Sequence, residues 1–356
     1  MAEDTSSIKS SRPIVVLDGR ESQSLTGGLL RARVREDVHG LSDCELEVGN
    51  WGPGEGGEPG FLYFDRATVD FGKRLELTVD DQPVFAGRIT GIEARFPEGK
   101  GPTVVMLAED ALQDLRMTRR TRSFSDASDA DVASQIAGDH GLTPDVSISG
   151  PQHRVLVQLN QSDLAFLRER ARALDADVTL SGRTLKVAPR AAAGSAITLT
   201  YGKELRELRV VADLAAQATD VRINGWDVAA KSAIAETAGP GLVSGELAGG
   251  QSGPQLLRSA FGERPDAHDN AMPQTGDEAR ARAEALLKRR ARRFIAGRGI
   301  SETKPGLRVG AKLKLVGLGP LFEGDFYLAA VTHLFDGDKG LRSEIAVERP
   351  GLGASS

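Results

Sequence analysis

Several features that are common in proteins are scarce or missing in this sequence of 356 residues. Cys44 is the only cysteine, so no disulfide bond can form within one chain, which fits folding in a reducing compartment. No apolar run approaches the length of a membrane span, and the polar residues 1–12 lack the apolar segment of a secretory signal peptide. We expect a flexible arm at residues 1–12, no membrane anchoring, and synthesis and assembly in the cytoplasm.

Residue patterns that carry catalysis or bind cofactors are also missing. The histidines are scattered and none belongs to an HExxH pair; they are His39, His140, His153, His268 and His333. There is no GxSxG elbow and no P-loop. Neighbouring carboxylates such as Glu109 and Asp110 would point to opposite sides of a strand. The sequence therefore predicts no enzymatic activity, no catalytic or metal-binding residues and no cofactor.

One glycine-rich segment imitates a phosphate-binding motif. Gly52, Gly54 and Gly57 spell GxGxxG within residues 51–60. A dinucleotide fingerprint requires a helix that opens at the motif, so that backbone amides meet the pyrophosphate. Here the intervening prolines and glutamates supply negative charge and no helix. We therefore interpret the segment as a flexible acidic hairpin loop.

The overall charge is slightly acidic, with two basic clusters. The formal net charge of -5 and the pI of about 5.7 argue against a general nucleic-acid binder. Residues 116–122 form either a solvated connector or a contact with an acidic partner surface. The cations of residues 288–293 lie at the C-terminal end of a predicted helix, where the helix dipole favours them. DNA binding by this second cluster is the less favoured alternative.

The chain contains one stretch twice, at residues 69–107 and 307–347. The copies share six identities in the same order: Gly72, Leu75, Leu77, Pro83, Phe85 and Gly87 match Gly310, Leu313, Leu315, Pro320, Phe322 and Gly324. In both copies the leucines alternate with charged residues, which is typical of a strand with one buried face. Turn residues at 97–101 and 336–340 precede a closing strand. We interpret the match as a duplicated β-domain, in which Phe85 and Phe322 anchor equivalent sites of two cores.

Three shorter strands are predicted before the first copy, at residues 13–17, 29–38 and 44–48. In the second of them Leu30, Ala32 and Val34 alternate with arginines, which favours strand over helix. The third alternates Cys44, Leu46 and Val48 with acidic residues. These patterns predict further β-structure around the first copy.

Between the two copies the pattern changes to helices and short strands. Ser128 and Asp131 form a capping box for a helix that ends near Gly138 or Gly141, which accounts for the local aspartates better than a calcium loop does. Ser162 is predicted to cap a second helix, whose buried stripe is Leu164, Leu167, Ala171 and Leu174. A hairpin over residues 177–187 and a linker at 191–194 follow.

The remaining segment divides into a strand, a loop and a helix. Residues 220–227 alternate as a strand, with Val221 and Ile223 facing inward. Residues 239–276 are rich in Gly, Pro, Ser and Gln, which favours a mobile loop. Residues 277–295 are rich in Ala, Leu, Glu and Arg and are predicted to be helical.

The segment QLNQSDLAFLRERA at residues 158–171 resembles the Q-x-N-x-S-D-x-x-F-L-x-R-x-A signature of the phage late control protein D family, with Glu169 in place of its arginine. Other parts agree in order. Residues 85–89 resemble the family's F-x-G-x-I strand, and residues 109–111 and 118–125 resemble its link into a helical insert. Residues 221–227 resemble V-x-V-x-G-W-D, and residues 324–333 resemble its closing strand, with Phe326 for Tyr and Leu328 for Val. His333 matches a family position inside that strand, which implies a packed structural role.

This resemblance implies a fold and an assembly. The family forms the baseplate hub of contractile phage tails and is similar to the N-terminal part of the type VI secretion spike protein VgrG. It implies a β-rich α+β fold with two related small β-barrels and an α/β insert, assembled as a homotrimer with pseudo-sixfold symmetry. The expected division is a first barrel at 13–115, an insert at 116–192, a second barrel at 193–350 with the mobile loop 239–276, and a tail at 351–356.

The resemblance also implies partners. We expect a structural component of a phage tail or tail-like particle that joins a hexameric tail tube to a separate trimeric spike, beside other baseplate proteins. The spike is expected to be separate because only residues 351–356 follow the second copy, with no needle domain. The alternative is a stand-alone binding protein or secreted effector of the same fold, which would be monomeric.

Overall fold

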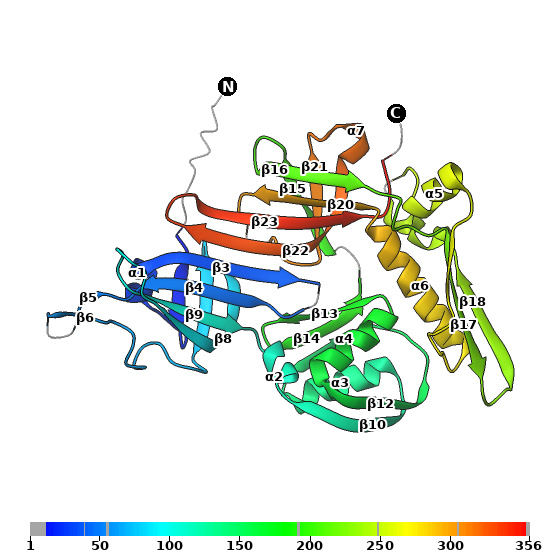
Figure 1. Cartoon of the computed structure of the whole chain (residues 1–356), viewed down its shortest axis with the longest axis horizontal. Helices are drawn as coiled ribbons and strands as arrows, with labels where there is room; N and C mark the ends of the chain where they lie inside the picture. Colours follow the sequence, from blue (N-terminus) through cyan, green and yellow to red (C-terminus); the bar gives the residue numbers. More distant parts are fainter. Residues whose placement is uncertain are drawn as a thin grey trace.

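The computed structural model of the protein describes residues 12–38, 40–54, 57–190, 193–247, 249–304 and 306–353. Most of the predicted arm, residues 1–11, lies outside them, as do His39 and residues 191–192. In Figure 1 one β-rich region lies above the other, and an α/β insert lies beside the lower region and beneath the upper one. Helix α6 (Gly276–Arg292) packs along the hairpin of β17 (Asp220–Asp227) and β18 (Ser232–Ala238) at the far end. Within the described residues, every helix is too short or too polar to cross a membrane.

The first β-unit consists of six strands in the order β1-β7-β8-β9-β4-β3. Their bounds are β1 Ile14–Leu17, β3 Leu29–Asp37, β4 Asp43–Gly49, β7 Arg74–Val79, β8 Gln82–Arg95 and β9 Thr103–Glu109. Short β2 (Arg20–Glu21) and helix α1 (Gln23–Gly28) follow β1, and the hairpin of β5 (Gly52–Pro53) and β6 (Pro59–Gly60) follows β4. The predicted alternation holds in β4, where Cys44, Leu46 and Val48 are buried.

The second β-unit has six strands in the corresponding order β15-β21-β22-β23-β20-β16. Their bounds are β15 Ala193–Thr200, β16 Leu205–Ala212, β20 Ile295–Ser301, β21 Ala311–Val316, β22 Gly324–Asp336 and β23 Gly340–Arg349. Corresponding strands also occur in the same order along the chain. One pairing differs in direction, because β1 runs antiparallel to β7 whereas β15 runs parallel to β21. The repeated topology is the structural counterpart of the sequence repeat.

Residues that occupy the same place in the two units, as judged from strand pairing, are not all the residues that match in sequence. Leu75 stands opposite Gly87 in the first unit, whereas Leu313 stands opposite Phe326 in the second. Gly87 therefore corresponds in space to Phe326. A bulge follows in both units, between Ile89 and Gly91 and between Leu328 and Ala330, and the pairing beyond it stays in step to the ends of β8 and β22.

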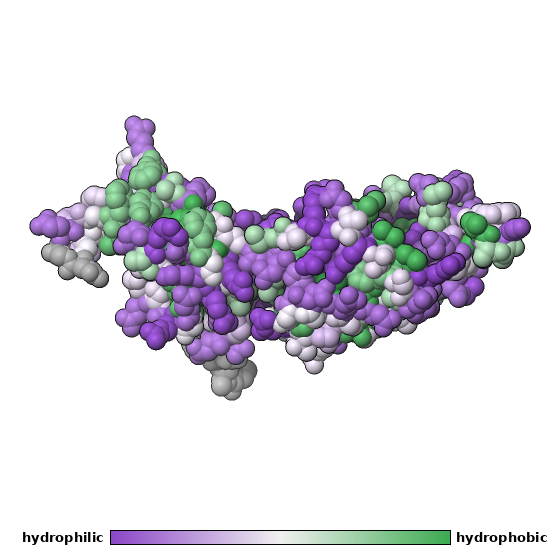
Figure 2. All heavy atoms as spheres, turned by 90° about the horizontal axis from the view of Figure 1, so that it is seen from below, coloured by the Kyte–Doolittle hydropathy of each residue, from purple (hydrophilic) through white to green (hydrophobic). Residues whose placement is uncertain are grey.

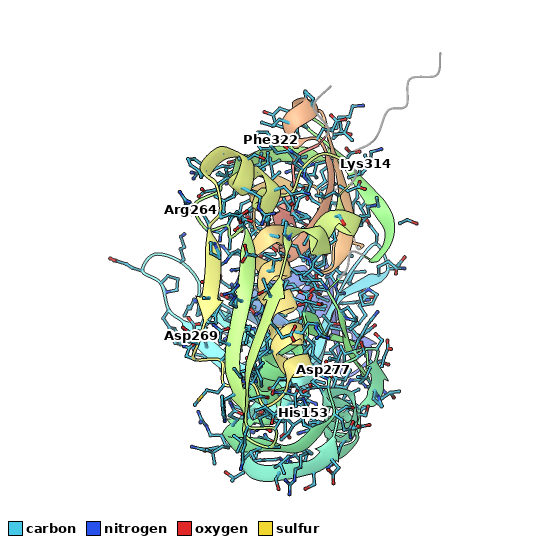
Figure 3. All side chains as sticks on the ribbon, turned by 90° about the vertical axis from the view of Figure 1, so that its right-hand side faces the viewer. His153, Arg264, Asp269, Asp277, Lys314 and Phe322 are labelled. Atoms are coloured by element: carbon cyan, nitrogen blue, oxygen red, sulfur yellow. The ribbon has the colours of Figure 1, made fainter. Side chains whose placement is uncertain are left out.

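The prediction that Phe322 is the counterpart of Phe85 is wrong. Phe85 is buried in β8 opposite Leu77, but the position opposite Leu315 is held by Gly324. Phe322 instead ends the short helix α7 (Gly319–Phe322) and is half-buried against the second core. It lies at the end of the molecule opposite to His153 of the insert (Figure 3).

The reason is the connection between the first two strands of each meander. The first unit joins β7 to β8 by the two residues Asp80 and Asp81, which both have positive φ. The second unit inserts α7 there, and this longer connection shifts the pairing by two residues. A shift of two keeps every side chain on its original face of the sheet, so the leucine pattern survives while the aromatic match does not.

The insert contains eight elements around its own buried cluster of apolar side chains. Their bounds are α2 Leu112–Arg116, β10 Arg119–Ala127, α3 Asp129–Asp139, β11 Thr143–Val146, β12 His153–Ser162, α4 Asp163–Ala173, β13 Ala176–Ser181 and β14 Thr184–Pro189. The capping predictions are confirmed: Ser128 and Asp131 form a capping box, and the Ser162 hydroxyl accepts from the amide of Ala165. The hairpin predicted over 177–187 is formed by β13 and β14.

Residues 239–276 are not the structureless loop that their composition predicts. They contain a 3-10 helix over Pro240–Glu246, helix α5 over Gly253–Phe261 and strand β19 over Pro265–His268. Ser252 and Gln255 form a capping box, and Val243 and Leu257 are buried. The capping box and these two buried apolar side chains give this polar segment a defined structure. A smaller correction concerns Leu30, which is exposed because a bulge in β3 interrupts the alternation.

Candidate functional site

The two β-units of one chain meet through a pair of strands. After Tyr327, strand β22 separates from β21, and its residues from Ala330 to Asp336 pair antiparallel with β3 of the first unit. Phe335 of β22 packs against the core of the first unit. The second unit thus offers the far half of its longest strand, with an aromatic anchor, to the edge strand of the first unit.

Each of these two strands has a counterpart in the other unit, and the corresponding edges of the counterparts are open among the described residues. Strand β8 pairs with β7 only as far as Arg88, and beyond it, within the described residues, β8 has a strand on its β9 side alone. Strand β16 corresponds to β3, and among the described strands it pairs with β20 alone, apart from an isolated bridge between its first residue, Leu205, and Tyr201. Since unpaired backbone groups favour addition of a further strand, both edges are candidates for pairing with another molecule.

The free edge of β8 ends in exposed aromatic side chains. Phe96, which corresponds by register to Phe335, is 66% exposed. Its ring centroid lies 6.1 Å from that of Phe61 and 5.8 Å from that of Phe64, and Trp51 packs edge-on against Phe61 at 5.3 Å. Hydrophobic residues gather on the face of this end of the molecule in Figure 2. A cluster of exposed aromatic side chains of this kind is typical of a protein contact.

The signature segment of the insert forms a buried polar network. Asp163, which is 1% exposed, accepts from Arg122 Nη2 and Gln158 Nε2, each at 2.8 Å, and its other oxygen lies 2.8 Å from His140 Nε2. Arg120 lies 3.2 Å from it. Burial opposes ionisation of Asp163, but these hydrogen bonds and charges outweigh it and hold its pKa below the ordinary value. The Gln and Asp of the signature therefore stabilise the insert.

Other polar residues singled out in the sequence also have structural partners. His153 Nε2 lies 3.3 Å from Asp129, which also receives Arg170, and His268 pairs with Asp266 at 3.0 Å. His333 is buried in β22, where its Nδ1 lies 2.8 Å from the Ser343 hydroxyl, and burial lowers its pKa to about 4. The packed role predicted for His333 is confirmed.

The glycine motif and the buried acidic groups occupy structural positions in the described parts of the chain. Gly52 belongs to the β5–β6 hairpin, as predicted, although residues 55 and 56 lie outside the described part of the chain. Asp110 accepts from the amides of Ser42 and Leu112, and burial raises its pKa to about 6. Within the described residues, no three His, Cys, Asp or Glu side chains gather in a way that could hold a metal ion.

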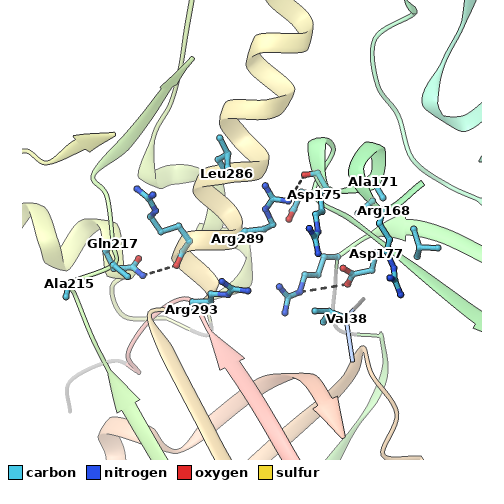
Figure 4. Close-up of a pocket in the computed structure, with 16 residues that line it drawn as sticks. Val38, Arg168, Ala171, Asp175, Asp177, Ala215, Gln217, Leu286, Arg289 and Arg293 are labelled. Atoms are coloured by element: carbon cyan, nitrogen blue, oxygen red, sulfur yellow. Dashed lines mark hydrogen bonds and ion pairs between the residues drawn. The ribbon is translucent and has the colours of Figure 1, made fainter. Parts of the chain in front are cut away.

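The basic clusters at residues 116–122 and 288–293 have different environments in the structure. Of residues 116–122, Arg116 pairs with Glu109, while Arg120 and Arg122 serve the Asp163 network. The cluster at 288–293 borders a groove of about 680 Å³ between α4 and α6 (Figure 4). Arg292 is fully engaged beside this groove, with Asp175 and Glu246 each at 2.6 Å.

Comparison with known proteins places the chain in a family. A protein-family model described as the Alg8 N-terminal domain matches residues 61–336, which is more than half of the chain. The chain belongs to the Alg8 N-terminal domain family. The matched range runs from the first β-unit through the insert to the end of β22. A search of curated protein sequences finds no match.

Solved structures identify the fold shared by this member of the Alg8 N-terminal domain family. The prophage MuSo2 43 kDa tail protein from Shewanella oneidensis is 12% identical, with a TM-score of 0.70 over 96% of this chain and 98% of that one. A tail protein from Neisseria meningitidis MC58 is also 12% identical, with a TM-score of 0.67 over 96% and 97%. The fold is therefore that of phage tail proteins, which confirms the β-rich α+β class inferred from the sequence resemblance.

A third structure links this fold to secretion systems. The E. coli c3393 protein, a type VI secretion component described as similar to the phage T4 tail proteins gp27 and gp5, is 12% identical. Its TM-score is 0.58 over 96% of this chain and 79% of that one. The same fold therefore occurs in phage tails and in a type VI secretion component.

Proposed function

We propose that the chain is a structural hub of a contractile phage tail or related injection system. Three copies would form a ring that joins a hexameric tail tube to a separate trimeric spike, beside other baseplate proteins. In this proposal the two β-units are the two related barrels of the hub, and residues 13–115, 116–192 and 193–350 are its domains. The fold shared with phage tail proteins supports the structural role.

The observation that carries this proposal is the repeated pair of edges. The junction of β22 with β3 uses edges whose counterparts, β8 and β16, are open on the outside of the chain. By register, Phe96 corresponds to the seated Phe335, and Leu208 of β16 corresponds to Ala32 of β3. A second chain could therefore place its β16 beside β8 and receive Phe96 in its second core, as the first core receives Phe335.

Such a contact joins β8 of one chain to β16 of the next, so each added chain leaves one edge of each kind free. The chains form a closed ring when the rotation between neighbouring chains is a whole fraction of a turn. Each chain contributes two similar β-units, so three chains present six similar faces around one axis. A hexameric tube can stack on six similar faces, while the threefold symmetry of the chains suits a trimeric spike. The alternative, a monomeric binding protein or effector, would leave both edges unpaired.

Cysteine cross-linking tests the proposed pairing directly. Thr332 stands opposite Arg35 at the internal junction, so the corresponding pair between chains is Glu93 and Val211. In the Glu93→Cys/Val211→Cys variant we expect a ladder of disulfide-linked species on non-reducing gels that ends at the trimer. Each single variant is the matched control and should give no ladder, since native Cys44 is buried.

Solution mass decides between the hub and its alternative. A trimer that binds the neighbouring tube and spike proteins is the expected result for the wild-type chain. Phe96→Asp should reduce it to a folded monomer, while Phe261→Asp, which alters another largely exposed phenylalanine, on α5, should stay trimeric. A wild-type monomer that binds neither neighbour, and no ladder from the double-cysteine variant, would refute the hub.

A further inference from the structure

The groove between α4 and α6 is lined by more positive than negative charge. Arginines line both of its walls: Arg168 and Arg172 from α4, Arg289 and Arg290 from α6, and Arg293, which caps the C-terminus of α6. Arg190 lies beside them, and the carboxylates that line it are Asp175 and Asp177. Figure 4 shows side chains from α4 and α6 facing each other across it. The lining of the groove therefore carries an excess of positive charge.

Most of the charged groups around the groove have partners in the chain. Arg190 lies 2.6 Å from Glu348, and Arg290 lies 2.5 Å from Asp266. Asp175 is taken by Arg292 at 2.6 Å, and Asp177 accepts from the hydroxyl of Tyr327 at 2.8 Å. The two lining carboxylates are therefore already engaged by other side chains, and Arg293 lies 3.6 Å from Glu348.

Two arginines on facing walls have no carboxylate partner among the residues that the structure describes. Arg168 makes no hydrogen bond or ion pair there, and its Nε is buried without an acceptor. Arg289 donates to the backbone oxygen of Arg172 at 2.8 Å. Burial lowers the pKa of both guanidinium groups, and neighbouring arginines lower it further, against the opposing charges of Asp37 and Asp175. A half-buried cation without an anion is costly, so this pair is suited to an acidic ligand.

The groove extends past these two arginines. A second hollow of about 600 Å³ shares Arg168, Arg172, Leu286 and Arg289 with the first. Apolar surface from Leu286 and from alanines of α4 lines both hollows beside the guanidinium groups. A single small anion would occupy one point, whereas an extended peptide with acidic and apolar side chains can contact both hollows. The acidic net charge of the chain disfavours a nucleic acid.

We propose that the groove between α4 and α6 binds an acidic segment of a partner protein, with Arg168 and Arg289 receiving its carboxylates. The guanidinium fork binds carboxylates in a bidentate manner. This site is separate from the β8 and β16 edges, so it does not depend on the ring. The residues that bind the partner are on the insert and on α6, which places the contact where these two parts of the chain meet.

Binding of a labelled peptide to the full chain tests this proposal. The probe is a short fluorescein-labelled peptide that alternates Glu with Leu, and the matched probe alternates Gln with Leu. We expect the Glu peptide to bind in a salt-sensitive manner and the Gln peptide to bind at least tenfold more weakly. Arg168→Gln and Arg289→Gln should each weaken the Glu peptide by roughly tenfold. Arg154→Gln removes the same charge from an exposed position on β12 and should leave binding unchanged.

Two further measurements keep the interpretation unambiguous. Arg168→Lys retains the charge but not the fork, so it should restore part of the affinity, and thermal unfolding should show that all variants fold. Equal binding by the Arg168→Gln/Arg289→Gln variant would overturn the proposal. So would displacement of the peptide by inorganic phosphate at the same concentration, because the site would then accept any small anion. Solution mass reports the ring separately, since these variants should assemble like the wild type.

Discussion

The two β-units use the same six strands in the same order, yet they fill their cores and finish their edges differently. In the first unit the ring of Phe85 lies over Gly87, where an added Cβ would meet its Cζ at 2.6 Å. In the second unit the aromatic and the glycine change places, as Gly324 and Phe326, and the guanidinium of Arg349 stacks on Phe326 at 4.7 Å. Both units therefore place one aromatic ring in the core beside this strand pair, but the ring comes from a different strand position in each unit.

The edges of the two units differ in occupancy. Phe335 packs into the neighbouring core within the same chain, whereas Phe96, at the corresponding position, is exposed. The buried pair of His333 and Ser343 is likewise particular to the second unit. Each difference can be tested by itself, because a substitution in one unit can be compared with a substitution at the corresponding position of the other unit.

The largest expected effect concerns the aromatic ring in each core. Phe85→Ala and Phe326→Ala should each lower the free energy of unfolding by roughly 3–5 kcal/mol, because both remove a buried ring and leave a cavity. Phe322→Ala should cost only about 1 kcal/mol, since that ring is half-buried. Urea unfolding of the three variants measures these values. A loss for Phe322→Ala as large as that for Phe85→Ala would restore the correspondence predicted from sequence.

The next effect is a dependence on pH that comes from His333 in the second unit. The pKa of His333 is lowered from 6.5 to about 4, so as pH falls through this window the unfolded chain takes up a proton that the folded chain does not. Stability from this residue is intact above pH 6.5 and falls by roughly 3 kcal/mol on approaching pH 4. Urea unfolding at several pH values should show a shallower loss for His333→Gln than for wild type. Identical slopes would mean that His333 is protonated in the folded chain.

A smaller effect separates the seated aromatic from the exposed one. Phe335→Ala should lower the stability of the monomeric chain by roughly 1–3 kcal/mol, because its ring packs into the first core. Phe96→Ala should change monomer stability by less than about 0.5 kcal/mol, as expected for an exposed side chain. Thermal unfolding at concentrations where the chain is monomeric provides the comparison. Equal losses of stability in the two variants would show that Phe335 and Phe96 do not differ in packing within the monomer.

The smallest effect lies in the turn that only the first unit has. Asp80 and Asp81 both have positive φ between the paired residues Val79 and Gln82, which is the geometry of a two-residue type I′ hairpin. Glycine suits the second position of such a turn, so Asp81→Gly should stabilise the chain by roughly 0.5 kcal/mol. Thermal unfolding can detect the increase. Destabilisation instead would indicate that the Asp81 side chain holds the turn.

Local patterns predicted much of the fold. Alternating apolar residues located β4 and β17, and the side chains of Ser128 and Ser162 located the starts of α3 and α4. These signals depend on neighbours within a few residues, so they can be read without tertiary contacts. The ordered segment 239–276 was missed because its composition resembles a loop, although the capping box of Ser252 and Gln255 was a signal that could have located α5.

The candidate sites were less accessible to prediction. The basic cluster at 288–293 was visible in the sequence, but its groove also depends on Arg168 from α4, more than a hundred residues earlier. The open edges of β8 and β16 could not be inferred, because an edge is defined by the strands that are beside it. The roles of Gln158 and Asp163 were likewise visible only once Arg122 and His140 came within hydrogen-bond distance.

The sequence by itself determined the β-rich class, the duplicated meander and the helix starts, because periodicity and capping are local properties of the chain. It also contained the signature that resembles contractile-tail proteins. Only the tertiary structure decided that Phe326, not Phe322, matches the first core, since a helix between β21 and β22 shifts the register by two residues. It alone showed that one junction is closed and its counterpart is open, because strand pairing joins residues that are hundreds of positions apart.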